Sequence, residues 1–552
     1  MSAAAGAITA PIILASVIPI LTTLPIVADS IFKFVLSLHK WVAILPVAVN
    51  VAVLGLGQPY SIGFLNCFSA LKLCELVTVI IFFIFLSLTN SKKLENILQL
   101  DDSSNGIVID PSKCIGCGLC VRACDKVAGQ GVLKLLDSPD GDKKKRKVIV
   151  ASGKPLSETN CIQCGQCSLA CPKEAIREKS HIELVEKVLK NPDSNLVPVC
   201  QTAPAVRINL SDALGLPAGT ISTGKMVTAL KMLGFKYVFD TNYGADLTIV
   251  EEAMEFVTRL TKGSGALPMF TSCCPAWVNY VEKSAPELIP NLSSCRSPLG
   301  MLSSVIQEVF AKRNGLTGKL LNVAIMPCTA KKDEIVRPQF EHEGKHETDL
   351  VITTRELAKM IKKAKIDFAN LPDTEFDNPF SQCSGAGAIF CGSGGVMEAA
   401  IRSAYFYATG EELKNTDVKE VRGPVEGIKY TSVDIKGTKV DVAVAQGVSN
   451  AMELIELIKK KDPKVANVKF VEVMACPGGC VLGGGSTKAK NKKAIEKRVE
   501  AVYKIDQGSS VRQSHNNPQV KELYKEEIGE VNGHRAHELF HTHFTDRSKG
   551  GN

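Results

Sequence analysis

The chain has 552 residues, of which 45% are hydrophobic and 22% charged. This length predicts about three to four domains, and the composition excludes a disordered or fibrous chain. Lysine and arginine outnumber aspartate and glutamate by 65 to 57, and aromatic residues make up 6%. We therefore expect no nucleic-acid partner, whereas the basic excess suits an acidic protein partner.

The 19 cysteines are the most informative residues, and twelve of them fall in four tight groups. Disulfide frameworks belong to short secreted chains, and this chain is long. The spacings are mostly those of metal ligands. The cysteines therefore predict a reducing compartment and thiolates that bind iron.

Residues 1–100 differ from the rest of the chain because they are strongly apolar. The stretches 6–28, 41–71 and 76–91 carry no charged side chain, and the first two are long enough to cross a bilayer. Lys33 and Lys40 follow the first stretch, and Lys92 and Lys93 follow the third. Three helical spans would place the remaining chain on the cytoplasmic or organelle-matrix side of a membrane. The alternatives are a buried helical subdomain and an extension outside the fold. The sequence fits neither a transit peptide nor a secretory signal.

Residues 101–190 contain two runs of four cysteines. The first is Cys114-x2-Cys117-x2-Cys120-x3-Cys124, and the second has the same spacing at Cys161, Cys164, Cys167 and Cys171. This spacing is the bacterial ferredoxin signature for two 4Fe–4S clusters, in which the fourth cysteine of each run binds the other cluster. Zinc is the alternative metal, but two complete runs favour iron–sulfur clusters. Such a module transfers single electrons.

A basic run at 143–147 lies between the two cysteine runs. We expect a solvated hairpin loop, because short basic runs are common. The alternatives are a localisation signal and a docking patch for an acidic electron carrier.

Residues 191–490 alternate strand-like and helical patterns, which predicts α/β layers. Buried strands are expected at 266–270, 321–325 and 470–473, and each leads directly into a cysteine motif. Ligands of open α/β sheets bind at the carboxyl ends of strands, so we expect these three ends to converge on one site. Residues 491–552 form a charged, helical tail with five of the nine histidines.

The three cysteine motifs of this region span 271–277, 326–334 and 472–485. Cys328, Cys476 and Cys480, with one of Cys273 and Cys274, make four thiolates, which suffice for a third 4Fe–4S cluster. The remaining thiol of the adjacent pair is a candidate proton donor or acceptor.

These motifs resemble the three signature motifs of iron-only (FeFe) hydrogenases, and the resemblance runs from about residue 107 to the C-terminus. It implies an α/β catalytic domain of two lobes with mixed sheets at 191–490. An α+β ferredoxin-like domain at 101–190 would precede it, and a small-subunit-like tail at 491–552 would follow. The implied cofactors are two 4Fe–4S clusters and the H-cluster, a 4Fe–4S cubane joined to a diiron unit with CO, cyanide and a dithiolate.

The resemblance also assigns residues to the H-cluster. It implies that Cys274, Cys328 and Cys476 bind the cubane and that Cys480 bridges the cubane to the diiron unit. Cys273 would be the proton relay beside the cluster.

Five further residues would surround the diiron unit. Met326 and Met474 would flank it as apolar walls. Lys331 would pair with one cyanide ligand, and Ala203 and Pro204 would pack against the other.

A proton path from solvent is also implied. Glu252, Glu255 and Arg259 have helical spacing and share one face of a helix. With Ser293 and Cys273 they resemble the relay of the family. The alternative is an ordinary solvated helix face.

The remaining features receive structural interpretations. The glycine-rich segment 383–400 suggests close packing rather than nucleotide binding, and the tail histidines lack a neighbouring cysteine in the sequence that would support a zinc site. Leu299 replaces a residue that is frequent in the family, and Ala330 lacks a hydroxyl that some members have. We expect both to lie behind the ligands. Buried structural thiols are expected at Cys67, Cys74, Cys200, Cys295, Cys383 and Cys391.

The predicted activity is reversible proton reduction to H2 with electrons from ferredoxin or a similar small carrier, after dedicated maturation proteins install the H-cluster. One alternative is a non-catalytic iron–sulfur assembly factor of the related family, which loses the spare cysteine and the Met326, Lys331 and Glu334 pattern. A sensory hydrogenase is the other, but no signalling domain is visible in the sequence.

Overall fold

The computed structural model describes residues 98–138, 140–191, 195–342, 344–422 and 427–548. The chain from Ile97 onward forms one compact unit. The predicted membrane spans end at residue 91 and lie outside the described residues. Among the described residues, no helix has both the length and the apolar character needed to cross a membrane.

The two cysteine runs fold into similar halves of an α+β layer. Strand β1 (Ile107–Ile109) pairs with β4 (Ile176–Glu178), and β2 (Leu133–Leu136) pairs with β3 (Lys147–Val150), both antiparallel. Helices α4 (Leu119–Arg122) and α5 (Gln166–Ala170) each begin after a glycine at φ 74° and 71°, respectively. Only glycine adopts this left-handed conformation without strain, which explains why both runs contain one at the same position.

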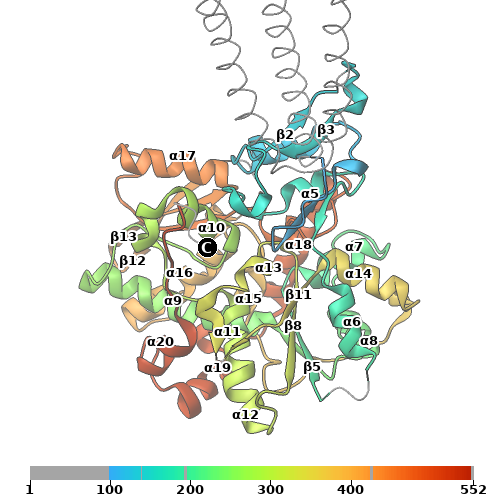
Figure 1. The fold of residues 1–552 in the computed structure, drawn as a ribbon. Coiled ribbons are helices and arrows are strands. Elements are labelled where there is room, and N and C mark those ends of the chain that lie inside the picture. The colour runs from blue at the N-terminus through green and yellow to red at the C-terminus, as the bar shows by residue number, and fades with distance from the viewer. Residues whose placement is uncertain (1–97, 139, 192–194, 343, 423–426, 549–552) are drawn as a thin grey trace, which may run out of the picture. The chain divides into compact units, whose positions relative to one another are not determined.

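The basic run connects β2 to β3 (Figure 1). It begins with a short turn at Lys143–Lys145, and the Lys145 side chain is 63% exposed. The expected solvated hairpin loop is therefore confirmed.

The first lobe of the larger region is built on a parallel sheet in the order β11-β8-β5-β6. Its strands are β5 (Val197–Thr202), β6 (Tyr237–Asp240), β8 (Leu320–Met326) and β11 (Leu350–Thr353). Every residue of β8 is buried, as expected for a strand covered on both faces. One face packs on α6 (Ile182–Leu189), α7 (Val206–Ala213), α8 (Thr223–Leu233) and α14 (Thr354–Lys363).

The second lobe is built on a mixed sheet in the order β12-β13-β14-β7. Its strands are β7 (Met269–Phe270), β12 (Ile428–Ile435), β13 (Thr438–Gln446) and β14 (Val468–Met474). Only β12 and β13 are antiparallel. Helix α17 (Val448–Lys459) covers one face, and α16 (Gly395–Thr409) covers the other. The two sheets stand on opposite sides of the unit (Figure 1).

The strand expected at 266–270 is shorter than predicted. Only Met269 and Phe270 pair with β14, because Pro268 has no N–H to donate to a sheet. The expected strands at 321–325 and 470–473 are confirmed within β8 and β14.

Helix α9 (Thr241–Lys262) joins the two lobes. Tyr243 and Leu247 pack in the core beside the parallel sheet, whereas Ala253 and Phe256 pack against the mixed sheet. The helix begins at Asp240, whose side chain accepts from the Asn242 N–H, and ends at Gly263 with φ 63°. One helix therefore contributes side chains to both lobes.

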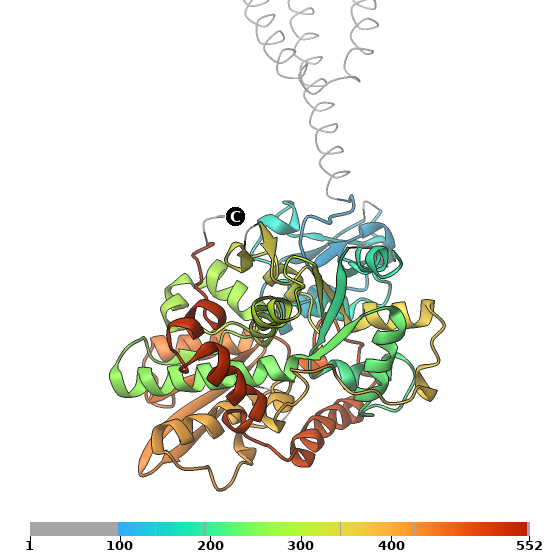
Figure 2. The ribbon, with the colours of Figure 1, turned by 90° about the horizontal axis from the view of Figure 1, so that it is seen from below.

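The remaining helices lie between the lobes and in the tail. They are α10 (Pro275–Ser284), α11 (Pro298–Val305), α12 (Ala311–Arg313), α13 (Lys331–Glu334), α15 (Gly385–Ile389), α18 (Lys492–Gly508), α19 (Pro518–Leu523) and α20 (His534–Phe540). Two short strands, β9 (Glu341–His342) and β10 (Lys345–His346), form a separate antiparallel pair. The tail is helical as predicted, and Figure 2 shows it in red along the outside of the unit.

Close packing explains the glycines at 383–400. A Cβ at Gly395 would lie 1.8 Å from the Ile389 carbonyl oxygen, and one at Gly385 would lie 2.2 Å from the Asp506 carboxylate. The segment forms α15 and the start of α16, which supports the packing interpretation over a nucleotide loop.

Candidate active site

Each half of the ferredoxin-like layer encloses a thiol-lined cavity. Both cavities take three thiols from one run and the fourth from the other run. One is lined by Cys114, Cys117, Cys120 and Cys171, and the other by Cys124, Cys161, Cys164 and Cys167. The structure thus brings together the crossed sets that the spacing predicts.

These thiols lie in surroundings that suit a metal cluster. Burial, and then the neighbouring thiols, raise the pKa of Cys120 to about 12. Burial also raises the pKa of Cys161 to about 11. Clustered thiols of this kind become thiolates when a metal supplies positive charge, so the two sets fit iron clusters.

A larger cavity lies between the two lobes. Its empty volume is about 770 Å³, which includes some space open to solvent. The carboxyl ends of four strands lead into it. Ala203 and Pro204 follow β5, Cys328 follows β8, Cys274 follows β7, and Cys476 follows β14. The predicted convergence is confirmed, and the converging strands come from both sheets.

The four thiols expected to bind the third cluster line this cavity, namely Cys274, Cys328, Cys476 and Cys480, and Cys273, Cys164 and Cys391 line it as well. Burial and then Cys274 raise the pKa of Cys476 to about 12. Burial also raises the pKa of Cys328 and of Cys480, and each is raised further by the other thiols of the set. This donor set fits a third iron cluster for the same reason as the first two.

The glycine loop of the third motif closes one side of the cavity. A Cβ at Gly483 would lie 2.1 Å from the Pro327 carbonyl oxygen, and one at Gly479 would lie 2.7 Å from that of Cys391. Side chains are excluded at these positions, which lets the backbone approach the thiols closely.

The five residues expected around the diiron unit all line the same cavity: Met326, Met474, Ala203, Pro204 and Lys331. The Lys331 Nζ donates to Ser297 Oγ at 2.7 Å and pairs with Glu334 Oε2 at 2.6 Å. Its side chain is only 9% exposed. The cavity therefore offers apolar walls and one buried ammonium, which fits a group with small anionic ligands.

Several lining residues were not predicted. Thr241 and Phe390 carry no metal-ligand spacing, and only the fold brings them to the cavity wall. Cys391 is a buried thiol as expected, but it also lines the cavity. The expectation for Leu299 is wrong, because the first turn of α11 faces the cavity and Leu299 lines it directly, whereas Ala330 is buried and is not among the lining residues.

Of the relay residues, Cys273 lines the cavity, whereas Glu252, Glu255 and Arg259 lie on α9 and Ser293 lies on the segment that follows α10. Glu252 is fully buried, and neither of its carboxyl oxygens has a hydrogen-bond partner among the described residues. Burial, and then repulsion from Glu255, raise the pKa of Glu252 to about 8. A buried carboxyl group that keeps its proton near neutral pH is suited to proton transfer.

Glu255 is held from two sides. The Ser293 hydroxyl donates to Glu255 Oε2 at 2.9 Å, and Arg259 pairs with Glu255 Oε1 at 2.6 Å. Arg259 also donates to the Leu292 carbonyl oxygen at 2.7 Å. The helix face is therefore part of a buried polar network rather than an ordinary solvated surface.

The other cysteines that were expected to be buried structural thiols differ in their burial. Cys200 and Cys295 are buried, Cys383 is half-buried, and Cys67 and Cys74 lie outside the described residues.

Two crossed sets of thiols beside a third set are the arrangement of an iron–sulfur protein. Comparison with known families gives the same class. The model of the iron-only hydrogenase large subunit, C-terminal domain, matches residues 197–484, and that of the iron hydrogenase small subunit matches 492–547. A 4Fe–4S dicluster domain matches 113–175.

Individual proteins and structures agree. Iron hydrogenase 1 of Clostridium pasteurianum is 43% identical over 451 residues, which cover 80% of this chain and 76% of that protein. An apo FeFe hydrogenase structure from Chlamydomonas reinhardtii matches with a TM-score of 0.60 and 40% identity, over 66% of this chain and 99% of that one. A cytosolic Fe–S cluster assembly factor of Danio rerio is 31% identical over 407 residues, 68% of this chain and 94% of that protein.

The chain belongs to the iron-only hydrogenase family. It is an oxidoreductase with two 4Fe–4S clusters in its dicluster domain and the H-cluster in its large-subunit domain.

Proposed function

We propose that this hydrogenase catalyses 2H⁺ + 2e⁻ ⇌ H2 with electrons from ferredoxin or a similar small carrier. The observation that carries this proposal is the common cavity, where four thiols, Lys331 and the spare thiol Cys273 face one space. The H-cluster supplies the site at which the H–H bond forms and breaks. The protein residues bind it, exclude water and supply protons.

We further propose a ligand set for the H-cluster. Cys274, Cys328 and Cys476 bind the cubane, and Cys480 binds at its junction with the diiron unit. The support is that all four thiols line one buried cavity. Met326 and Met474 provide its apolar walls.

Lys331 and the segment after β5 hold the cyanide ligands in this proposal. Lys331 is buried with its Nζ near Ser297 and Glu334, so its ammonium is fixed in one position. Ala203 and Pro204 line the same cavity and present small, apolar surfaces.

Protons follow the α9 network. In the direction of H2 formation, Glu255 receives a proton near the surface while Arg259 fixes its orientation. The Ser293 hydroxyl, which contacts Glu255 at 2.9 Å, turns to accept this proton from Glu255 while it gives its own proton to Glu252, and Glu252 passes a proton to Cys273. Glu252 suits the intermediate step because its buried carboxyl is protonated near neutral pH.

Electrons enter at the first cysteine run. Cys117 is exposed, and Ile115 beside it is 47% exposed. Arg146 Nη2 donates to the Gly116 carbonyl oxygen at 3.2 Å, which holds the basic run against this loop. An acidic carrier such as ferredoxin would dock here. Cys164 lines both the second thiol cavity and the central cavity, so it connects the two sites.

The domain division that we propose follows from these roles. Residues 101–190 transfer electrons, residues 191–490 hold the H-cluster, and residues 491–552 form the small-subunit-like tail.

The assembly-factor alternative is less well supported. It predicts loss of the spare cysteine and of the Met326, Lys331 and Glu334 pattern. This chain keeps all of them, and Lys331 pairs with Glu334 at 2.6 Å at the cavity wall.

We also propose that residues 1–100 anchor the enzyme to a membrane, with the catalytic part on the cytoplasmic or organelle-matrix side. The support is the charge pattern alone. Deletion of residues 1–100 should release the protein from the membrane fraction, and a full-length chain that stays in the soluble fraction would contradict the anchor.

An infrared spectrum tests the proposed activity. The protein would be produced in a host with hydrogenase maturation proteins and purified without oxygen. We expect sharp bands from iron-bound CO and cyanide together with H2 evolution, and Cys328→Ser should lose those bands. Absence of the bands in a protein that binds about twelve irons, as three cubanes, would instead support the assembly factor.

A further inference from the structure

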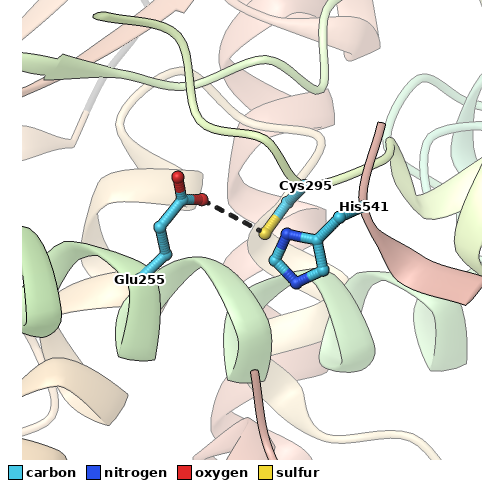
Figure 3. Close-up of side chains that lie close together, drawn as sticks. All are labelled: Glu255, Cys295 and His541. Atoms are coloured by element: carbon cyan, nitrogen blue, oxygen red, sulfur yellow. Dashed lines mark hydrogen bonds between the residues drawn. The ribbon is translucent and has the colours of Figure 1, made fainter. Parts of the chain in front are cut away.

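A further group of side chains that could bind a metal ion includes Glu255 of the proposed proton relay. A carboxylate oxygen of Glu255, the Cys295 Sγ and a ring nitrogen of His541 all lie within 4.8 Å of one another. Figure 3 shows the three side chains pointing toward one another from α9, the segment after α10, and the end of the tail. Carboxylate, thiolate and imidazole are the usual ligands of zinc in proteins.

The backbone fixes this arrangement. Cys295 and His541 face each other in an antiparallel β-bridge. Arg296 N donates to the Phe540 carbonyl oxygen at 2.8 Å, and Thr542 N donates to that of Ser294 at 2.7 Å. The thiol and the imidazole are therefore held side by side before any ion binds.

The three side chains are largely withdrawn from water. Cys295 is 1% and His541 is 7% exposed, and the Glu255 side chain is 12% exposed. The Cys295 Sγ lies 3.6 Å from Glu255 Oε2. The His541 ring lies against the exposed ring of His537, with the centroids 4.0 Å apart and the ring planes tilted by 30°. His537 thus gives an incoming ion a first contact at the surface.

The surroundings carry an excess of carboxylates. Glu251 Oε2 lies 3.1 Å from His541 Nε2, and Glu251 is fully buried. Arg259 pairs with Glu255 Oε1, whereas among the described residues no lysine or arginine is found paired with Glu251. A divalent cation would balance this charge.

We propose that Glu255, Cys295 and His541 bind one Zn²⁺ or a similar divalent transition-metal ion, with Glu251 or water as the fourth ligand. Binding releases the Cys295 thiol proton to solvent and involves no redox change. The bound ion occupies the Glu255 carboxylate and blocks proton entry to the H-cluster. This blocking effect rests on the proposed relay, whereas the ion-binding site does not.

A second cluster shows why this trio is distinctive. Glu398, Asp417 and Asp506 also lie within 4.8 Å of one another. There, Arg402, Arg422 and Arg512 already pair with the carboxylates. That cluster is neutralised by the protein itself and needs no ion.

X-ray absorption at the zinc edge tests the site, because iron has its absorption edge at a different energy. The holoenzyme would be loaded with one equivalent of Zn²⁺ without oxygen. We expect one sulfur ligand at about 2.3 Å and nitrogen or oxygen ligands at about 2.0–2.2 Å. Cys295→Ala should lose the sulfur ligand, and both Cys295→Ala and His541→Gln should bind Zn²⁺ at least tenfold more weakly.

Cys200→Ala is the matched control, since it removes another buried free thiol, in β5. It should leave the zinc spectrum unchanged. A wild-type spectrum without sulfur, or Cys295→Ala and His541→Gln proteins that bind Zn²⁺ like the wild type, would overturn the site.

Activity tests the blocking effect separately. Zn²⁺ should lower H2 evolution by the wild type at least tenfold, a chelator should restore it, and the ratio of rates with and without Zn²⁺ should approach one in Cys295→Ala. If zinc binds with the expected ligands but H2 evolution is unchanged, the relay through Glu255 is overturned and the metal site stands.

Discussion

The carbonyl oxygen of Cys164 lies where a side chain on Gly484 would begin, because a Cβ at Gly484 would come within 2.1 Å of it. Ser168 Oγ also donates to the Gly484 carbonyl oxygen at 3.3 Å. The second cysteine run and the glycine loop after Cys480 are therefore in direct backbone contact. In the proposed ligand assignment, this contact fixes the separation between the thiols of the second 4Fe–4S cluster and those of the H-cluster.

Gly484→Ala should disturb this contact. The added methyl group cannot be accommodated without moving backbone, so we expect the free energy of unfolding to fall by about 1–3 kcal/mol. Chemical denaturation of the anaerobic holoenzyme measures this change. Gly508→Ala at the end of α18 is the control, because its Cβ would meet nothing within 4 Å. Equal stability of the two variants would contradict the tight contact.

Cys273→Ala should separate proton supply from cofactor binding. We expect unchanged iron content and infrared bands, with H2 evolution lowered by about 10²–10⁴-fold, as for loss of a general acid. Cys391→Ala removes another free thiol of the same cavity wall and should retain most of the activity. A Cys273→Ala enzyme with full activity would exclude the relay role.

Glu252 should make stability depend on pH. Its pKa rises from 4.5 to about 8 in the folded protein. Between these values the unfolded chain loses the proton and the folded protein keeps it, so the free energy of unfolding falls as pH rises. Glutamine does not titrate, so Glu252→Gln should gain stability over the wild type between pH 5 and pH 8, on the order of 1–3 kcal/mol.

Anaerobic calorimetry at the two pH values measures the difference in melting temperature between Glu252→Gln and the wild type. The same variant should lose H2 evolution, because an amide cannot pass the proton on. A melting difference that stays constant across this range would show that Glu252 ionises normally in the fold.

Reversing charge on the β2–β3 loop should weaken electron delivery. We expect the double variant Lys143→Glu and Lys144→Glu to raise KM for reduced ferredoxin several-fold at low salt, with little change in kcat, because an acidic carrier is steered less well. Rates with a small artificial donor should stay the same.

Lys521→Glu on α19 is the control for this experiment, since α19 lies at the opposite end of the unit from β2 and β3 (Figure 1). If both charge reversals change KM equally, or neither does, the carrier does not dock on the loop.

Local patterns in the sequence were enough for much of this protein. The two cysteine runs predicted the crossed thiol sets, because their spacing lets one short loop supply three ligands of one cluster. Apolar runs ahead of the motifs at 321–325 and 470–473 predicted strands β8 and β14, because a buried parallel strand is a continuous apolar segment. Helical spacing placed Glu252, Glu255 and Arg259 on one face of α9.

Features that depend on residues distant in the chain were decided by the tertiary structure. The division of the motif strands between two sheets and the exposure of Leu299 to the cavity were not visible in local patterns. The clearest case is His541, which the sequence presents without a cysteine nearby, whereas the fold pairs it with Cys295 across a β-bridge. The sequence by itself determines ligand types and local spacing; side-chain neighbours between remote segments follow only from how the lobes and the tail pack together.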